Sequence, residues 1–231
     1  MPIKAILWDI DNTLLDFSYA ERASLELALR THALPCTDAI AADYSRINLE
    51  YWRALERGEL TRAELRVRRF EDFFAAEAFP PELARPTADV YESLLGEQIR
   101  FVPGALETVN ALRGRVRQYA ASNGIISIQR RKLEKSGLAA LLDGVFISGE
   151  LGADKPSPAF FDAVLAALPG LDRGEILMVG DSLTSDVRGA VRYGLPTVWF
   201  NPKGAPLTVE EKPDWTIRKL EEVAPIVGIN N

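Results

Sequence analysis

The sequence contains very little of the two side chains that most often bind transition metals. It has one cysteine, Cys36, and one histidine, His32, among 231 residues. A single cysteine excludes an internal disulfide and a cluster of thiolate ligands. A zinc site or a catalytic relay that uses imidazole would have to depend on His32 alone. We interpret His32 as a residue near a helix end, so the chemistry of this chain must be sought among other side chains.

Long apolar runs and an excess of basic residues are also missing. No stretch approaches the roughly 20 apolar residues that span a bilayer, and the opening residues Met-Pro-Ile-Lys run directly into a predicted strand without a signal peptide. The 27 Lys and Arg residues are outnumbered by 33 Asp and Glu, which gives a net charge of −6 and argues against nonspecific nucleic-acid binding. We expect a soluble cytoplasmic protein that acts on a small molecule, with no membrane or nucleic-acid partner.

The first apolar segment ends in two carboxylates. Residues 4–8 predict a buried strand, and Asp9 and Asp11 follow it directly. Two like charges about 4 Å apart repel by roughly 4 kcal/mol at an effective dielectric constant near 20. The pair therefore predicts a cation between the two side chains, and an Asx turn or a helix cap is the structural alternative.

Residues 16–97 show helical patterns and no strand. Ser18 with Glu21, and Thr61 with Glu64, have the spacing of capping boxes, and Thr37 is a further candidate N-cap. Gly58 and the pair Pro80-Pro81 are typical helix terminators. About four helices are expected, as an all-helical domain inserted after the first strand.

From residue 98 onward, strands alternate with helices. The predicted strands cover 116–121, 145–148, 176–179, 197–200 and 215–217. This alternation predicts an α/β fold with a doubly wound parallel sheet. We therefore predict a core of residues 1–15 and 98–231 and a helical cap of residues 16–97. If the second and third strands lie on one side of the first and the fourth and fifth on the other, the first strand is central.

Polar residues follow four of the predicted strands. Ser122 and Asn123 follow the second, Lys155 comes in a loop after the third, and Asp181 and Asp186 follow the fourth. Each motif alone is compatible with a turn, an exposed lysine or a helix cap. Ligands of open α/β sheets bind at the carboxyl ends of the strands, so the four motifs together predict one convergent site.

The residue types of this site suit phosphate chemistry. Asp9, Asp11 and Asp181 provide the hard oxygen ligands that Mg²⁺ prefers, and Lys155 and the Ser122 hydroxyl suit phosphate oxygens. A carboxylate facing a bound phosphoryl group can act as a nucleophile and form an aspartyl-phosphate. A second carboxylate two residues later can protonate the leaving oxygen and then activate water. These residues predict a Mg²⁺-dependent phosphomonoesterase.

The motifs resemble, in order, those of the haloacid-dehalogenase-like (HAD) hydrolase superfamily. They are Asp9-Ile10-Asp11-Asn12-Thr13, Ser122-Asn123-Gly124, Lys155-Pro156 and Gly180-Asp181-Ser182 with Asp186. The resemblance implies a Rossmann-like core with a C1-type helical cap. It also implies that Asp9 is the nucleophile and a metal ligand, and that Asp11 is the general acid/base and binds Mg²⁺ through its backbone carbonyl. Asp181 would be a further metal ligand, with Asp186 as an outer support. The implied phosphate-binding groups are Ser122, Lys155 and backbone groups of Asn12 and Asn123.

Further segments resemble the bacterial house-cleaning pyrimidine 5′-nucleotidase branch. They include Trp52, Gly58–Thr61 and Arg69-Phe70 in the cap, Ser122–Ile125 with Arg131–Gly137, and Val198–Asn201. Ser122 stands where threonine is frequent in that branch, and both residues carry a hydroxyl. The resemblance implies a nucleoside 5′-monophosphate as substrate. Cap aromatics are candidates for stacking on a base, although their helical spacing favours a place in the helical core.

Other functions remain open at this stage. A phosphoglycolate or sugar-phosphate phosphatase would use the same motifs. A 2-haloacid dehalogenase would keep an aspartate nucleophile, but it needs no metal and normally lacks the second acid that Asp11 provides. A phospho-acceptor signalling module would carry no helical insertion after its first strand. The sequence leaves monomer and homodimer equally possible.

Overall fold

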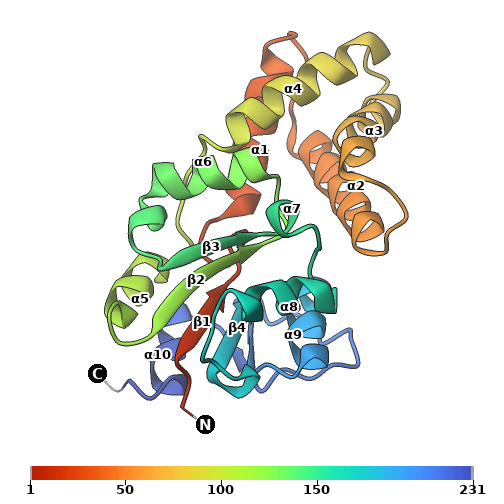
Figure 1. Cartoon of the computed structure of the whole chain (residues 1–231). Helices are drawn as coiled ribbons and strands as arrows, with labels where there is room; N and C mark the ends of the chain where they lie inside the picture. The colour runs from red at the N-terminus through yellow and green to blue at the C-terminus, as the bar shows by residue number, and fades with distance from the viewer. Residues whose placement is uncertain (1, 230–231) are drawn as a thin grey trace. The chain divides into compact units, whose positions relative to one another are not determined.

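The computed structural model describes residues 2–229 and divides the chain into two compact units. The core unit comprises Met1–Asp16 and Ile99–Asn231, and the helical unit is the insertion Phe17–Gln98 (Figure 1). Each unit has its own buried interior. Along the described residues, we find no helix that combines the length and the apolar character of a membrane span.

The core unit contains a parallel sheet of six strands in the order β3-β2-β1-β4-β5-β6. The first strand lies between β2 and β4, which meets the condition under which the sequence makes it central, and the chain turns to opposite sides of it. This reversal makes the carboxyl end of β1 the topological switch point of the sheet, where a crevice opens in doubly wound folds. The strands are β1 (Ala5–Trp8), β2 (Arg117–Ser122), β3 (Gly144–Ile147), β4 (Ile176–Gly180), β5 (Thr197–Phe200) and β6 (Trp215–Ile217).

Helices cover both faces of this sheet. In β1, Ile6 and Trp8 pack on one side with α5 (Ala105–Leu112), α6 (Ile126–Ser136) and α10 (Val223–Ile226). Ala5 and Leu7 pack on the other side with α8 (Pro158–Ala166) and α9 (Arg188–Tyr193). All four strand residues are fully buried, which explains why β1 is a continuous apolar run without polar alternation. The helices on both faces thus account for the apolar composition of β1.

Two short segments of the core unit carry the chain to and from the insertion. Leu15 forms an antiparallel bridge with Phe101, and the Val102 N–H donates to the Leu14 carbonyl at 3.0 Å. The Asp16 N–H donates to the carbonyl of Arg100 at 2.8 Å. The residues that leave β1 and those that return toward α5 therefore form a two-stranded connection at the edge of the core unit.

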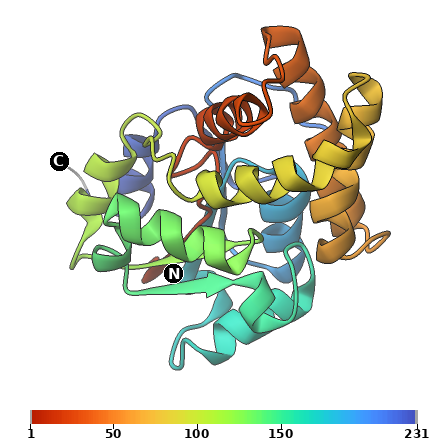
Figure 2. The same cartoon turned by 90° about the horizontal axis from the view of Figure 1, so that it is seen from above.

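The helical unit consists mainly of four α-helices, drawn in red to yellow in Figure 2. The side chain of Thr37 caps α2, and Thr61 with Glu64 forms the predicted capping box at α3. Gly58, with a φ angle of 72°, follows the end of α2. The helices are α1 (Phe17–Arg30), α2 (Asp38–Glu56), α3 (Arg62–Ala76) and α4 (Ala84–Leu95).

Aromatic rings fill the interior of the helical unit. Tyr44 lies within 5.3 Å, centroid to centroid, of Phe70, Phe73 and Tyr91, and all four side chains are completely buried. Phe74 is equally buried, so the helical spacing of these residues is that of a packed core. Partly exposed aromatics of this unit are Phe17, Tyr19, Tyr51, Trp52 and Phe79.

Several boundaries differ from the sequence expectation. Helix α1 begins at Phe17, so Ser18 lies in its first turn and is not the residue before it. The predicted third strand ends one residue early, because Ser148 starts the short, unpredicted helix α7 (Ser148–Leu151). A π-helical turn, η4 (Leu183–Val187), precedes α9 where one regular helix was predicted. Differences of one or two residues at element ends are expected, because end residues carry weak sequence signals.

Candidate active site

The predicted polar residues meet at the carboxyl ends of β1, β2 and β4. Asp9 directly follows β1, and its N–H donates to the Val179 carbonyl of β4 at 2.9 Å. Ser122 is the last residue of β2, and Asp181 directly follows Gly180, the last residue of β4. Parallel strands end at the same edge of the sheet, so local positions far apart in sequence converge there.

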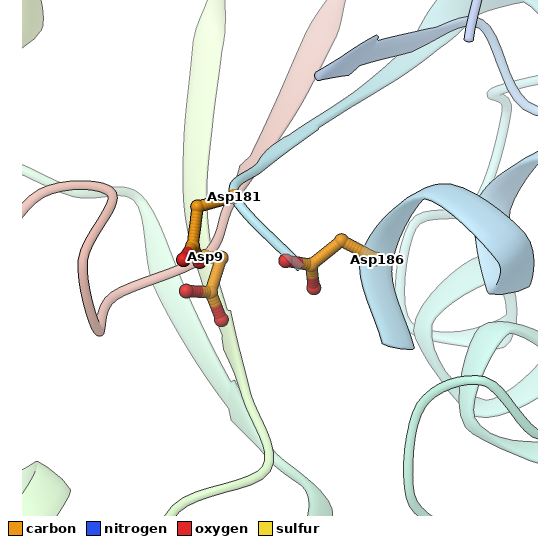
Figure 3. A group of neighbouring side chains, drawn as sticks. All are labelled: Asp9, Asp181 and Asp186. Carbon is orange, nitrogen blue, oxygen red and sulfur yellow. The ribbon is translucent and has the colours of Figure 1, made fainter. Parts of the chain in front are cut away.

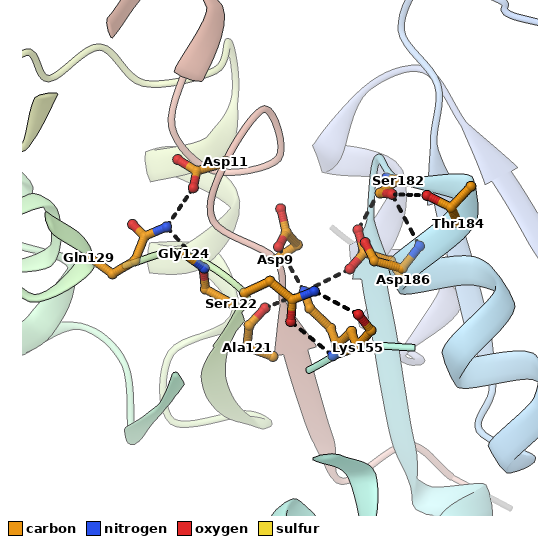
Figure 4. Close-up of polar contacts among 12 residues, drawn as sticks. Asp9, Asp11, Ala121, Ser122, Gly124, Gln129, Lys155, Ser182, Thr184 and Asp186 are labelled. Carbon is orange, nitrogen blue, oxygen red and sulfur yellow. Dashed lines mark hydrogen bonds and ion pairs between the residues drawn. The ribbon is translucent and has the colours of Figure 1, made fainter. Parts of the chain in front are cut away.

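Lys155 is the cation at the centre of the site (Figure 4). Its Nζ atom donates to Asp9 Oδ1 at 2.8 Å, to Asp186 Oδ1 at 2.7 Å and to the Ala121 carbonyl at 2.5 Å. Burial lowers the pKa of this ammonium, but the carboxylates of Asp186 and Asp9 raise it more, so the net shift of the pKa is upward. Lys155 is therefore charged and fixed by three acceptors.

Three carboxylates surround a space that suits a divalent cation. One oxygen from each of Asp9, Asp181 and Asp186 lies within 4.8 Å of the others (Figure 3). Burial, followed by the charges of Asp186 and Asp11, raises the pKa of Asp9 to about 7, although Lys155 opposes this shift. Burial and the Asp9 charge also hold the pKa of Asp181 well above its usual range. One ammonium cannot balance three carboxylates, and this oxygen donor set fits Mg²⁺.

Asp186 is oriented from two directions. Its Oδ1 accepts from Lys155, and its Oδ2 accepts from the Ser182 N–H at 3.1 Å. Gly180 leaves room for this side chain, because a Cβ atom there would lie 2.2 Å from Asp186 Oδ2. The π-helical turn η4 carries Asp186, so this local widening of the helix sets the position of a site carboxylate.

Ser122 and Asn123 have different tasks. The Ser122 oxygen accepts from the Gly124 N–H at 3.0 Å and from Gln129 Nε2 at 2.9 Å, which uses its acceptor positions and leaves the hydroxyl proton to donate. The Asn123 side chain donates to the Lys155 carbonyl at 2.7 Å and accepts from the Lys155 N–H at 2.9 Å. Asn123 thereby fixes the backbone of the lysine loop, where the Lys155–Pro156 peptide bond is cis.

The loop after Asp9 presents backbone donors. Asn12 has a left-handed φ of 60°, and its N–H donates to the Leu15 carbonyl at 2.7 Å. That N–H is therefore used within the loop, and the predicted phosphate contact of the Asn12 backbone stays a prediction. The N–H groups of Ile10 and Asp11 form no backbone–backbone hydrogen bond within residues 2–229. These two donors are better placed to bind an anion.

Two residues of α6 contact the site without having been predicted there. Gln129 Nε2 donates to Asp11 Oδ2 at 2.5 Å, and Lys132 Nζ donates to Asp11 Oδ1 at 2.6 Å. Their spacing of three places them on one face of the helix that follows Ser122. A buried polar face on that helix would have been the signal, but its sequence resembles an ordinary exposed face.

The family assignment rests on the length of the matched region. A family model described as haloacid dehalogenase-like hydrolase matches residues 3–194, and all the motif residues lie within it. The chain belongs to the haloacid dehalogenase-like hydrolase family. The parallel sheet with an inserted helical unit is consistent with this assignment.

Relatives of known name align along almost the whole of this HAD hydrolase. The HAD-hydrolase YfnB of Bacillus subtilis is 33% identical over 228 residues, covering 99% of this chain and 97% of YfnB. Pyrimidine 5′-nucleotidase PynA of Streptococcus pneumoniae is 31% identical, covering 98% of this chain and 96% of PynA. Pyrimidine 5′-nucleotidase YjjG of Escherichia coli is 30% identical, with 96% of each chain covered.

A solved structure shares the architecture of this hydrolase. The crystal structure of YfnB bound to magnesium superposes with a TM-score of 0.93 at 32% identity, covering 99% of this chain and 100% of YfnB. The fold class predicted from the sequence is therefore confirmed.

Proposed function

We propose that this HAD hydrolase is a Mg²⁺-dependent phosphomonoesterase that cleaves nucleoside 5′-monophosphates through an aspartyl-phosphate. The observation that carries the proposal is the arrangement of Asp9, Asp181 and Asp186 around Lys155, with a donor hydroxyl on Ser122 nearby. This arrangement combines a nucleophilic carboxylate, a cation site and donors for phosphate oxygens. The proposed mechanism uses Asp11, and not a histidine, as general acid and base.

In the first step, an Asp9 oxygen attacks phosphorus and the ester P–O bond breaks. Asp11 donates a proton to the leaving oxygen, so the product departs as an alcohol and not as an alkoxide. Lys155 and the Ser122 hydroxyl bind the equatorial phosphate oxygens, where negative charge is spread in the transition state. The backbone N–H groups of Ile10 and Asp11 are additional donors for the same oxygens.

In the second step, water attacks the phosphorus of the aspartyl-phosphate. Asp11, now ionised, accepts a proton from this water, and the P–O bond to Asp9 breaks. The step releases inorganic phosphate and restores the Asp9 carboxylate. Asn123 acts indirectly, because its side chain holds the lysine loop in place through both steps.

Asp9, Asp181 and the Asp11 carbonyl would hold the magnesium ion. Asp186 belongs to the same group of carboxylates, but its two oxygens already accept from Lys155 and Ser182, so we assign it a supporting role outside the ligands. When bound, Mg²⁺ offsets the repulsion between the carboxylate nucleophile and the phosphate dianion. Asp186 contacts Lys155 directly, so it orients the ammonium even without contacting substrate. The structure of YfnB bound to magnesium supports this choice of ion.

The relatives PynA and YjjG, both named pyrimidine 5′-nucleotidases, support the substrate class. We place the chemistry in the core unit and substrate selection in the helical unit. The fully buried rings of the helical unit are needed for its packing. The partly exposed Tyr19, Tyr51 and Trp52 remain as candidates for stacking on a base.

The decisive experiment measures phosphate release from a panel of nucleotides, sugar phosphates and phosphoglycolate, with Mg²⁺ and with chelator. We expect pyrimidine nucleoside monophosphates to rank first and activity to disappear in chelator. Asp9→Asn should lower kcat by at least about 10³-fold, because it removes the nucleophile. Asp89→Asn, at an exposed position of α4, is the matched control.

The outcomes separate the alternatives. If a sugar phosphate or phosphoglycolate ranks above every nucleotide, the substrate assignment is wrong but the phosphatase assignment holds. Halide release from a 2-haloacid, unaffected by chelator, would instead support a dehalogenase. Wild-type turnover by Asp9→Asn would contradict the aspartyl-phosphate mechanism.

A further inference from the structure

The Asp11 carboxylate is held at both oxygens by one helix. Gln129 Nε2 donates to Oδ2 at 2.5 Å and Lys132 Nζ donates to Oδ1 at 2.6 Å. Both donors belong to α6 and are 1% and 2% exposed, whereas the Asp11 side chain is 26% exposed. One donor at each oxygen fixes the plane of the carboxylate as well as its position. Figure 4 shows Asp11 and Gln129 facing each other at one edge of the site.

We propose that Gln129 and Lys132 are positioning residues, which fix the orientation of the Asp11 carboxyl group. The protonated form of this group gives its proton to the leaving oxygen in the first step, and the carboxylate form accepts a proton from water in the second. The inference rests on the proposed phosphomonoesterase function and adds two residues to it. Neither residue is assigned a contact with substrate, so both act through Asp11.

Gln129 also links Asp11 to the phosphate-binding hydroxyl. Its Nε2 donates to Ser122 Oγ at 2.9 Å as well as to Asp11, so one amide group contacts the proton donor and the hydroxyl together. Small movements of one group are therefore transmitted to the other. Gln129 thereby couples the position of the Ser122 hydroxyl to that of the Asp11 carboxyl group.

The two hydrogen bonds to Asp11 and Ser122 determine the orientation of the Gln129 amide. Its Oε1 atom is buried and has no hydrogen-bond partner within residues 2–229. A buried acceptor without a partner destabilises the folded state, whereas an apolar side chain of similar size would not. Reversing the amide would place its oxygen against the Asp11 carboxylate. Gln129 is therefore better explained by Asp11 and Ser122 than by the stability of the core.

Gly124 provides the space for this side chain. A Cβ atom at position 124 would lie 2.0 Å from Gln129 Nε2 and 2.6 Å from its Cδ. Gly124 does not have a positive φ angle, so room for Gln129 and not backbone conformation explains glycine here. The Ser122-Asn123-Gly124 motif thus contributes the Ser122 hydroxyl, the Asn123 side chain that holds the Lys155 backbone, and room at Gly124 for the Gln129 side chain.

The test compares two esters that differ in their need for a general acid. An alkyl phosphate leaves as a strong base and requires a proton, whereas 4-nitrophenyl phosphate leaves as a stable anion. We expect Lys132→Met and Gln129→Met to lower kcat/KM by at least about 30-fold for the alkyl ester and by less than about threefold for the nitrophenyl ester. Lys135→Met, at an exposed position of the same helix, should leave both values unchanged.

A second readout follows the hydrolysis of the aspartyl-phosphate, which also uses Asp11. With 4-nitrophenyl phosphate, both variants should show a pre-steady-state burst of nitrophenolate equal to the enzyme concentration. In an Asp11→Asn background, Lys132→Met should change kcat by less than about twofold, because its target is already removed. Lys132→Arg should restore part of the alkyl-ester activity.

The result can overturn the proposal in two ways. Equal losses for both esters, or a further large loss in the Asp11→Asn background, would show that Lys132 and Gln129 act elsewhere. If the wild-type enzyme hydrolyses neither ester, the proposed function itself fails, and the positioning roles fail with it. Should Lys132→Met not fold, Gly124→Ala provides the second variant, since it displaces Gln129 and should reproduce the difference between the esters.

Discussion

At the scale of single residues, the site brings together carboxylates whose like charges repel one another. Asp9 faces Asp186, Asp11 and Asp181, and the nearest opposing charge is Lys155. The geometry that prepares a cation site therefore destabilises the protein when no cation is bound. Such a conflict is typical of functional sites, where local stability is reduced for the sake of the chemistry.

The metal-free protein should lose stability as the pH rises through the range of about 4 to 7. The pKa of Asp9 rises from 3.8 to about 7 on folding, so the folded state binds the proton more tightly than the unfolded state. Below about pH 4 both states are protonated, and above about pH 7 the full penalty applies. Since one pKa unit corresponds to about 1.4 kcal/mol, the penalty is on the order of 4 kcal/mol.

Asp9→Asn isolates this effect. In chelator, we expect the variant to be more stable than the wild type by less than about 1 kcal/mol at pH 4 and by about 4 kcal/mol at pH 8. Urea unfolding at the two pH values measures the difference. A gain in stability that is the same at both pH values would contradict the explanation, because a packing effect does not titrate.

The sequence predicts the charged residues of the site but not their partners. Asp9 and Asp181 directly follow buried strands, and Lys155 lies in the loop after α7, so their shared placement along the chain makes them visible. Gln129 and Lys132 lie within a helix, where polar side chains are usually exposed. Their burial depends on tertiary packing, which the local pattern does not contain.

At the scale of the elements, the helical unit is organised around a buried polar network. Arg69 is 1% exposed and donates to Asn48 at 2.9 Å and to Glu92 at 3.2 Å. Asn48 in turn donates to Glu21 at 2.7 Å. The guanidinium also lies over the rings of Phe70 and Tyr91. One arginine thus connects α1, α2 and α4 through its neighbours.

Arg69→Met should destabilise the helical unit by about 1–3 kcal/mol, because the buried Asn48 oxygen loses its donor. Glu92 keeps only its ion pair with Arg66. Arg66→Met is a matched control on the same helix. Arg66 pairs with the same Glu92, but its side chain is 49% exposed, so its loss should cost at most about 1 kcal/mol. Chemical unfolding followed by tryptophan fluorescence gives both values. Equal effects would show that burial does not distinguish the two arginines.

Element boundaries were predicted where a residue provides a hydrogen-bonding reason for them. Thr37, Thr61 with Glu64, and Gly137 mark helix ends through contacts that depend on local chemistry alone. The π-helical turn at Leu183–Val187 has no such local marker. It is associated with the contacts that Asp186 makes with Lys155 and Ser182, which depend on tertiary structure. The sequence therefore predicts regular ends better than functional irregularities.

At the scale of the whole molecule, the motifs predict that four strands end at the same edge of one sheet, but not the order of those strands. The central position of β1 was only a conditional expectation, and the structure places β1 between β2 and β4. The position of one unit relative to the other has no comparable sequence signal, since the insertion has its own interior.

Magnesium should stabilise the folded protein as a whole. Binding to the folded state alone adds about 2.7 kcal/mol at a concentration 100 times the Kd, which corresponds to a rise in Tm of roughly 5–10 °C for a chain of this size. Asp181→Asn should lose most of this rise, because it removes a ligand. Calorimetry with Mg²⁺ and with a monovalent salt at equal ionic strength measures the difference. A similar rise in the variant would contradict the assignment of Asp181.

The short ribbon formed by Leu14–Asp16 and Arg100–Val102 allows the inserted segment to vary during evolution without disturbing the sheet. The chain leaves the sheet and returns to it at adjacent points, held by the Leu15–Phe101 bridge and the Asp16–Arg100 hydrogen bond. An insertion at this place imposes no change on the order or register of the strands. The helical unit can therefore lengthen, diverge or be exchanged for another as a cassette, while Asp9 and Asp181 keep their places at the ends of β1 and β4.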